Sequence, residues 1–352
     1  MLTISPLDDL TIRFCLAEDK SLAGDLLERW NEDIDIDTMS FGIMRLVPLI
    51  HHQITRFGLS SPHGKRLKVI YKFWWVAYQH RSNQLQQIHT LLSDHGIPMM
   101  IIKGAGLIDY YENPIHRPMA DIDVLVPTKN HSKALDLFLN NFWVLEYPER
   151  HKRCLLTTKL ELDAPHGVAL LNTITGTKLD LHRRIGSNTS NQVSDWVWST
   201  AVPAVSLPGL NKPAIHLELL MIVVHAVMAS FNDNLNWLVD LAHMQKQLTE
   251  EDWDRALKAA VAEKKADIFL FGCHLARQYG ISIPTWLPQA ETPKLPPPDP
   301  IRKPYITWIK RVNSALYFEI HHRHPNRALP LKWVIHVYIF AVRGFVFLGR
   351  SI

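Results

Sequence analysis

The spacing of apolar residues divides the chain into helical ends and a central region of strands. Through residues 1–97, apolar side chains recur at helical spacing, as Leu85, Ile88 and Leu92 illustrate. Short apolar runs and strict alternation follow in residues 98–182, which is the period of β-strands, and helical spacing then returns. The pattern predicts an α+β fold, with a mixed β-sheet core flanked by N- and C-terminal helical regions.

Turn residues and prolines set the expected element boundaries. His95-Gly96 ends the last helix of the N-terminal region before Ile97-Pro98. The expected strands cover 99–102, 121–126, 153–162 and 166–182, the last with a turn at 173–177. The expected helices cover 107–111, 130–141, 214–229, 236–248, 251–264 and 266–279. The predicted organisation is an N-terminal helical region (1–97), a sheet core (98–205), a C-terminal helical domain (206–288), and a proline-rich linker with a docking helix (289–352).

One predicted strand carries two aspartates on the same face. Ile122, Val124 and Val126 alternate with Asp121 and Asp123, so the apolar and acidic side chains point in opposite directions. Aspartate is a poor strand former, and two ionised carboxylates on one face repel each other. The alternative is an edge strand with solvated carboxylates, but the buried-type residues between them argue against it. A divalent, oxygen-preferring ion such as Mg²⁺ explains the pair.

A third aspartate and a glycine turn extend this pattern. In residues 178–182, Asp180 shares a face with Lys178 and His182, and its strand could lie beside the first. The turn at 103–106 precedes a helix and could present backbone N–H groups to phosphate. Three carboxylates with two metal ions can activate a hydroxyl and stabilise a leaving pyrophosphate. The combination therefore favours nucleotidyl transfer.

The same residues resemble the nucleotidyltransferase superfamily related to DNA polymerase β, and more closely the bacterial family of uncharacterised nucleotidyltransferases. The similarity covers roughly residues 40–280 and identifies the predicted sheet as a nucleotidyltransferase core. Gly104-Ala105 stands where the superfamily has Gly-Gly or Gly-Ser. The residues that carry the resemblance are Ile102-Lys103-Gly104, Arg117, Asp121-Ile122-Asp123-Val124-Leu125-Val126, Leu179-Asp180-Leu181-His182, His225 and Trp237-Leu238-Val239-Asp240.

The resemblance implies an enzyme that moves a nucleoside monophosphate from an NTP to an acceptor hydroxyl and releases pyrophosphate. The acceptor would be a small molecule, a protein or an RNA. Mg²⁺ or Mn²⁺ would be bound by Asp121, Asp123 and Asp180, with Asp180 also acting as general base. The implied nucleotide contacts are Lys103, Gly104, Ala105, Arg117, His182 and Asp240. The alternatives are a toxin-like enzyme that modifies tRNA and a non-catalytic protein that binds a nucleotide or a partner.

Each candidate residue also has a structural interpretation. Repulsion among the carboxylates further predicts that Asp123→Asn stabilises the metal-free protein. The structural interpretations, in chain order, are a solvated strand end for Lys103, a tight turn for Gly104 and Gly106, bonds to loop carbonyls for Arg117, an ion pair with Lys178 or Arg183 for Asp180, a bond within the strand for His182, and a mutual bond for His225 and Asp240.

Composition bears on the partners and the compartment. The net charge of +4 over 352 residues permits anionic ligands but does not indicate nucleic-acid binding. The cysteines are three and widely spaced, which is typical of reduced thiols (Cys15, Cys154 and Cys273). The N-terminus lacks the pattern of a signal peptide, and no apolar run reaches the roughly 18 residues of a membrane span. We therefore expect a cytoplasmic protein.

Two features near the C-terminus have a structural interpretation. The histidines of 321–324 lie in a proline-bounded segment and predict a solvated stretch rather than a metal site. The run 331–348 is apolar but interrupted by Lys332, His336 and Arg343. It predicts a docking helix, with a membrane-surface helix as the alternative.

Overall fold

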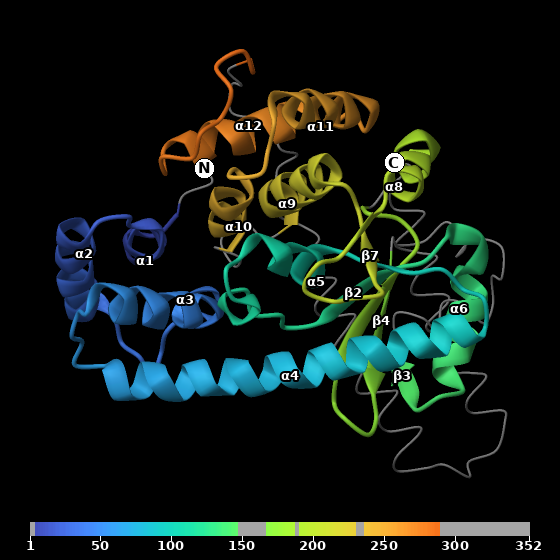
Figure 1. Cartoon of the computed structure of the whole chain (residues 1–352), viewed down its shortest axis with the longest axis horizontal. Helices are drawn as coiled ribbons and strands as arrows, with labels where there is room; N and C mark the ends of the chain where they lie inside the picture. The colour runs from blue at the N-terminus through green and yellow to red at the C-terminus, as the bar shows by residue number, and fades with distance from the viewer. Residues whose placement is uncertain (1–3, 147–166, 187–189, 230–235, 289–352) are drawn as a thin grey trace, which may run out of the picture. The chain divides into compact units, whose positions relative to one another are not determined.

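The structure, a computed structural model, describes part of the chain (Figure 1). The described residues are 4–146, 167–186, 190–229 and 236–288. They belong to one compact unit, built from residues 1–146 and 163–294. The expected strand over 153–162 lies outside the described residues, as do the linker and docking helix of 289–352 and the histidines of 321–324.

The N-terminal region is helical, as the apolar spacing predicted. Ser5, Asp19 and Ser40 each accept a hydrogen bond from a backbone N–H three residues later, which fixes the start of the first three helices. The long helix α4 contacts α3 and extends to the sheet, where its later turns are buried (Figure 1). The four helices are α1 (Pro6–Leu16), α2 (Lys20–Asp33), α3 (Phe41–Phe57) and α4 (Gly64–Asp94).

The described strands form one mixed sheet in the order β3-β4-β5-β2-β1-β7-β6. In the middle of the sheet, β2 runs parallel to β5 and antiparallel to β1. The strands are β1 (Met100–Ile101), β2 (Ile122–Leu125), β3 (Trp143–Leu145), β4 (Gly167–Asn172), β5 (Lys178–His182), β6 (Val202–Pro203) and β7 (Asn211–Lys212).

The two faces of the sheet belong to different cores. Ile122 and Val124 of β2 are fully buried and share a cluster with apolar residues of α4 and α6 (His131–Leu139). Leu125, on the opposite face, belongs to a second cluster that includes the helices after residue 214. The acidic face of β2 is therefore covered by the C-terminal helices.

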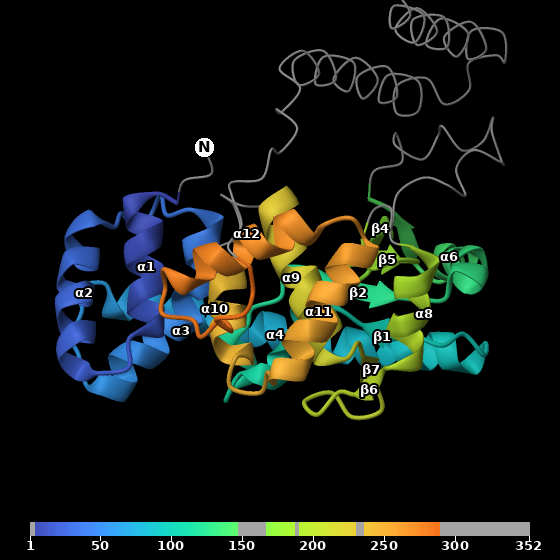
Figure 2. The ribbon, with the colours of Figure 1, turned by 90° about the horizontal axis from the view of Figure 1, so that it is seen from above.

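The C-terminal helices confirm the predicted positions to within a few residues. Helix α9 lies at their centre, and both α11 and α12 pack on it (Figure 2). Gly272 of α12 permits the close approach, because a Cβ there would lie 2.4 Å from a methyl carbon of Val223. Among the described helices, none has the length and apolar character needed to cross a membrane. The helices are α9 (Ile215–Ala229), α10 (Asn236–Met244), α11 (Glu250–Ala262) and α12 (Ala266–Arg277).

Several elements differ from the sequence prediction. Helix α8 (Asn191–Ser199) and the short strands β3, β6 and β7 were not predicted. The helix expected over 107–111 instead begins at Lys103, as α5 (Lys103–Leu107), and continues as a 3₁₀-helix, η1 (Ile108–Tyr110). Strand β7 joins the sheet beyond residue 205, where the predicted core ended, so the division into domains stays a prediction.

Candidate active site

The paired strands β2 and β5 bring two aspartates together. Asp123 and Asp180 are register partners in the parallel pair, so their side chains project from the same face of the sheet. Asp121 precedes Asp123 by two residues and shares that face. The prediction that Asp180 lies on the strand beside the first two aspartates, on their face, is confirmed.

A histidine completes the group of possible metal ligands. Ligand atoms of Asp123, Asp180 and His182 all lie within 4.8 Å of one another. His182 is 1% exposed, and its Nε2 lies 2.8 Å from Oδ1 of Asp123. The sequence predicts His182 as a nucleotide contact or a bond within its strand and Asp121 as a metal ligand, whereas this group contains His182 and not Asp121. The alternation in 178–182 already put His182 beside Asp180 on one face, which was the available signal.

Lys103 provides the cation of this cluster. Its Nζ donates a hydrogen bond to Oδ1 of Asp123 at 2.6 Å and lies 3.3 Å from Nε2 of His182. The side chain is 22% exposed, so a solvated strand end is not what the structure shows. Lys103 has a φ of 50°, a left-handed conformation that a lysine adopts only at a cost in free energy. The backbone strain helps to place the ammonium group among the carboxylates.

Charge and burial give the carboxylates different proton affinities. Burial disfavours the charged form of Asp123, but Lys103 and His182 outweigh it and hold the pKa of Asp123 well below its usual range. Burial and the neighbouring Asp123 raise the pKa of Asp180 to about 6. The same two causes raise the pKa of Asp121. One carboxylate is therefore firmly ionised, while its neighbours take up protons more readily.

A cavity of about 230 Å³ opens beside the cluster. Asp121 and Asp123 line one side with Lys103. The other side includes His225 of α9 and Trp237 of α10, so the C-terminal helices supply a wall of this cavity.

Arg45 of α3 also lines this cavity, although we predicted no site residue before 98. Its Nη2 makes one long hydrogen bond, 3.5 Å, to the carbonyl of Pro118. Its buried Nε has no hydrogen-bond partner among the described residues. Burial and the charge of Arg117 lower the pKa of Arg45 to about 10. A lone arginine in the apolar stretch 41–50 was the only sequence signal.

Arg117 and Asp240 bind each other at the back of the cavity. Nε of Arg117 donates to Oδ1 of Asp240 at 2.5 Å, and the two side chains are 5% and 2% exposed. The Tyr111 hydroxyl donates to the same oxygen at 2.6 Å. Nη1 of Arg117 also donates to the carbonyl of Pro118, as its structural interpretation proposed. Both residues line the cavity, and their contact with a nucleotide stays a prediction.

The glycines of α5 do not relieve a tight turn. Gly104 and Gly106 lie within the helix, and neither has a positive φ. A Cβ on Gly106 would lie 2.6 Å from Oε1 of Glu218, so α5 can approach α9 only with glycine at this position. A Cβ on Gly104 would make an ordinary contact, 3.5 Å, with Met119. Gly104 lines the cavity, while the Ala105 side chain is buried.

A second buried lysine, Lys212, holds α5 in place. Nζ of Lys212 donates to the Gly106 carbonyl at 2.9 Å and pairs with Asp109 at 3.3 Å and Glu218 at 3.2 Å. The Tyr110 hydroxyl donates to Glu218 at 2.5 Å. The helix that begins at Lys103 is thus fixed to the sheet and to α9.

The site combines carboxylates on adjacent strands of a mixed sheet with a short helix and a cavity. The family model described as "Uncharacterised nucleotidyltransferase" matches residues 43–280, which is more than half of the chain. The chain therefore belongs to this nucleotidyltransferase family, which implies an NTP as substrate. No curated protein matches it.

Proposed function

We propose that this protein transfers a nucleoside monophosphate from an NTP to an acceptor hydroxyl and releases pyrophosphate. One observation carries the proposal: Asp123 and Asp180 lie side by side on one face of β2 and β5, and Asp121 and Asp123 line a cavity. The family assignment supports a transferase role for this site. The acceptor is proposed only as a hydroxyl compound.

The donor set fits a divalent cation. Asp123 and Asp180 offer carboxylate oxygens, and His182 offers a ring nitrogen within the same 4.8 Å group. Carboxylates suit Mg²⁺ and Mn²⁺, and an imidazole ligand suits Mn²⁺ better than Mg²⁺. Asp121 would add a further oxygen from the cavity wall. When bound, the ion would supply positive charge to the transferring phosphoryl group and to the attacking and leaving oxygens.

The reaction forms one bond and breaks one. The acceptor oxygen attacks the α-phosphorus of the NTP, and the bond from that phosphorus to the bridging oxygen of pyrophosphate breaks. The hydroxyl proton passes to the carboxylate of Asp180. Burial and the neighbouring Asp123 make Asp180 take up a proton more readily than Asp123 does, which suits Asp180 to this role.

Cationic side chains on the cavity wall would hold the triphosphate. Lys103 of α5 and Arg45 of α3 line the cavity. Arg45 makes one long hydrogen bond, and its buried Nε has no partner among the described residues. Backbone groups of Gly104 and Ala105 would add contacts at the start of α5. His225 and Trp237 would enclose the nucleoside, and the Arg117–Asp240 pair would keep that wall in place.

Label transfer tests the proposal. The full-length protein would be incubated with each NTP labelled at its α-phosphate, with Mg²⁺ or Mn²⁺, and with a cell lysate as the source of acceptors. We expect one class of molecule to take up label with the wild type and none with Asp123→Asn. The control is Asp136→Asn, since Asp136 is exposed on α6 away from the cluster. Equal labelling by wild type and Asp123→Asn would overturn the assignment.

A further inference from the structure

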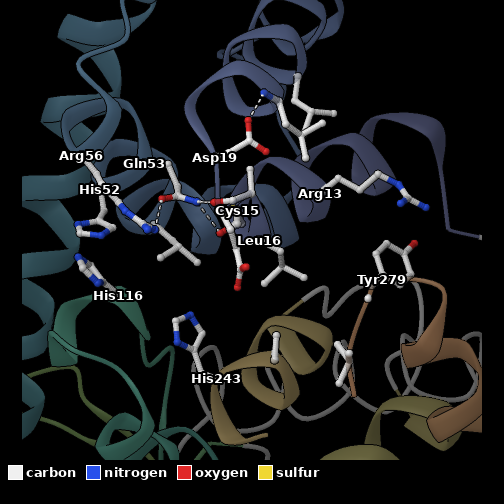
Figure 3. A pocket seen from close by; sticks show the side chains of 18 of the residues that line it. Arg13, Cys15, Leu16, Asp19, His52, Gln53, Arg56, His116, His243 and Tyr279 are labelled. Atoms are coloured by element: carbon white, nitrogen blue, oxygen red, sulfur yellow. Dashed lines mark hydrogen bonds between the residues drawn. The ribbon is translucent and has the colours of Figure 1, made fainter. Parts of the chain in front are cut away.

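A larger cavity, of about 530 Å³, lies apart from the carboxylates (Figure 3). Its walls come from α1, α2 and α3, from the 3₁₀-helix η2 (Pro114–His116), from α10, and from residues 279–281. Helices α1 and α2 precede residue 43, where the family match begins. The cavity is therefore built partly from a region of this chain that the family does not cover.

One corner of this cavity collects nitrogen-bearing side chains from three elements. His52 and Arg56 lie one turn apart on α3, His116 comes from η2, and His243 and Lys246 lie at the end of α10. The rings of His52 and His116 are 4.4 Å apart between centroids. His243 lies across the cavity from these two rings (Figure 3). We call these five residues the imidazole corner.

The imidazoles of this corner have unused hydrogen-bonding capacity. No ring nitrogen of His52, His116 or His243 bonds to a residue in the described part of the chain. His116 is only 8% exposed, although it lines the cavity. A neutral imidazole offers one donor and one acceptor, and buried polar groups normally find partners. These nitrogens are therefore available to a ligand.

Burial is the main reason that the imidazoles of this corner are neutral. Burial and then its neighbours His52 and His243 lower the pKa of His116 to about 4, with a further contribution from His51. Burial and then Lys246 lower the pKa of His243 to about 4, against Asp240 and Glu112, which raise it.

The pKa of His52 is lowered in the same way. Burial lowers it most, Glu112 raises it, and Arg56 lowers it again. All three imidazoles are thus held neutral at pH 7, in part by neighbouring cations and imidazoles. An anion in this corner would favour uptake of protons by the rings, because a nearby opposite charge stabilises the protonated form.

Tyr279 and Leu16 lie on the side of the cavity away from His52 and His116 (Figure 3). The Tyr279 ring is 5.0 Å from the guanidinium carbon of Arg13, and Leu22 and Leu26 of α2 also line the cavity. The carboxylate of Asp19 is engaged, because it accepts a hydrogen bond at the start of α2. A ligand that fills both ends has an anionic group and an apolar or aromatic body.

We propose that this cavity binds a small phosphate monoester, with its phosphate in the imidazole corner and an aromatic or apolar body toward Tyr279. The volume falls in the range of sites for small molecules, roughly 300–1,000 Å³. The site is distinct from the NTP site proposed above and does not depend on that function being correct.

A series of residue contacts runs between the linings of the two cavities. His243 stacks on Tyr111 at 4.1 Å, and the Tyr111 hydroxyl holds Asp240. Asp240 in turn holds Arg117, which lines the smaller cavity. A phosphate bound at His243 therefore contacts a series of residues that ends at the lining of the smaller cavity.

Calorimetry on the full-length protein in EDTA tests the proposal. The probes are AMP and phenyl phosphate, with adenosine as the matched compound that lacks phosphate. We expect both phosphates to bind, with proton uptake at pH 7, and adenosine to bind at least tenfold more weakly. AMP binding well above phenyl phosphate would identify a nucleotide ligand, and equal binding would identify the phosphate with any aromatic body.

Variants assign the binding to the cavity. Arg56→Met with Lys246→Met removes two exposed cations of the imidazole corner and should weaken AMP binding at least tenfold. The control pair, Arg255→Met with Lys258→Met, removes two exposed cations of α11 and should change nothing. Arg45→Met, in the smaller cavity, should leave AMP affinity intact. Adenosine binding as tightly as AMP, no phosphate binding at millimolar concentration, or a loss caused only by Arg45→Met would each overturn the proposal.

Discussion

Two lysines of this protein are surrounded by carboxylates, one at each end of α5, and their surroundings differ. The ammonium group of Lys212 pairs with the carboxylates of Asp109 and Glu218 and donates a hydrogen bond to the Gly106 carbonyl. Asp109 is itself held by the backbone N–H groups of Val205 and Ser206. Neither described cavity includes Lys212, Asp109 or Glu218. This cluster is closed and has a structural role.

Lys103, at the other end of α5, has fewer partners and more acid around it. It bonds to Asp123 and contacts His182, while Asp121 and Asp180 lie near enough to raise its pKa. Three carboxylates share this one ammonium, and the cluster borders a cavity. The comparison teaches that a buried lysine and acids alone do not mark a site. The cluster at Lys103 differs because it borders a cavity, through which a ligand can reach its carboxylates.

Replacing Lys212, the lysine of the closed cluster, should have the largest effect on the stability of the protein. Lys212→Met leaves the buried charges of Asp109 and Glu218 without their cation, so the free energy of unfolding should fall by about 3–5 kcal/mol. Urea denaturation in EDTA and in Mn²⁺ measures it. Because the cluster at Lys212 borders neither cavity, Mn²⁺ should not restore stability. A full recovery of stability with Mn²⁺ would contradict the proposed difference between the two lysine clusters.

Removing the central carboxylate of the open cluster should abolish function and preserve the fold. Asp123→Asn should lower kcat/KM by about 10²–10³-fold or more, since a charge aimed at the transition state is lost. Label transfer measures the rate of the reaction, and circular dichroism shows whether the fold is retained. The low pKa of Asp123 argues against a stabilising effect of this change in the metal-free protein, because Lys103 and His182 favour the ionised form of Asp123. Wild-type activity in this variant would remove Asp123 from the site.

Replacing Lys103, the lysine of the cluster that borders the cavity, should lower the stability of the protein, and metal ions should restore it. Lys103→Met leaves three carboxylates without their nearest ammonium, and the free energy of unfolding in EDTA should fall by about 1–3 kcal/mol. Added Mn²⁺ should recover much of this loss, since a cation can reach the cluster from the cavity. Lys212→Met is the matched comparison. If Mn²⁺ has the same effect on both variants, the cluster at Lys103 is not a metal site.

The smallest effect concerns Asp180 and has a defined pH range. Its pKa is raised from 3.8 to about 6, so its charged form costs folding free energy above pH 6. Asp180→Asn should therefore stabilise the metal-free protein at pH 8 by on the order of 1 kcal/mol. As the pH falls from 6 to 4, the wild type takes up this proton only when folded, so its deficit should disappear. Thermal denaturation from pH 8 to pH 4 in EDTA measures the difference, and a constant difference would contradict the raised pKa.

The sequence was sufficient for the acidic strands and their shared face. Strands β2 and β5 alternate regularly over several residues, so the face of Asp121, Asp123, Asp180 and His182 followed from the period alone. The long helices were predictable for the same reason. Strands β6 and β7 have two residues each, and so short a strand carries no period.

The contacts that complete the site depend on tertiary packing. Arg117 and Asp240 are 123 positions apart, and only the packing of α10 beside the core brings them together. Arg45 lies in a helix that shows an ordinary apolar pattern, so the neighbouring sequence does not indicate that Arg45 lines the cavity. The positive φ of Lys103 is likewise imposed by its surroundings, because lysine does not prefer it.

Diffraction from crystals grown with Mn²⁺ and a non-hydrolysable NTP analogue tests the central claim most directly. Anomalous scattering from Mn²⁺ locates the ion without any assumption about the acceptor. The account predicts a Mn²⁺ peak within ligand distance of Asp123 and Asp180, with the triphosphate in the cavity beside Lys103. Mn²⁺ and the nucleotide bound elsewhere, with Lys103 still paired to Asp123, would contradict it.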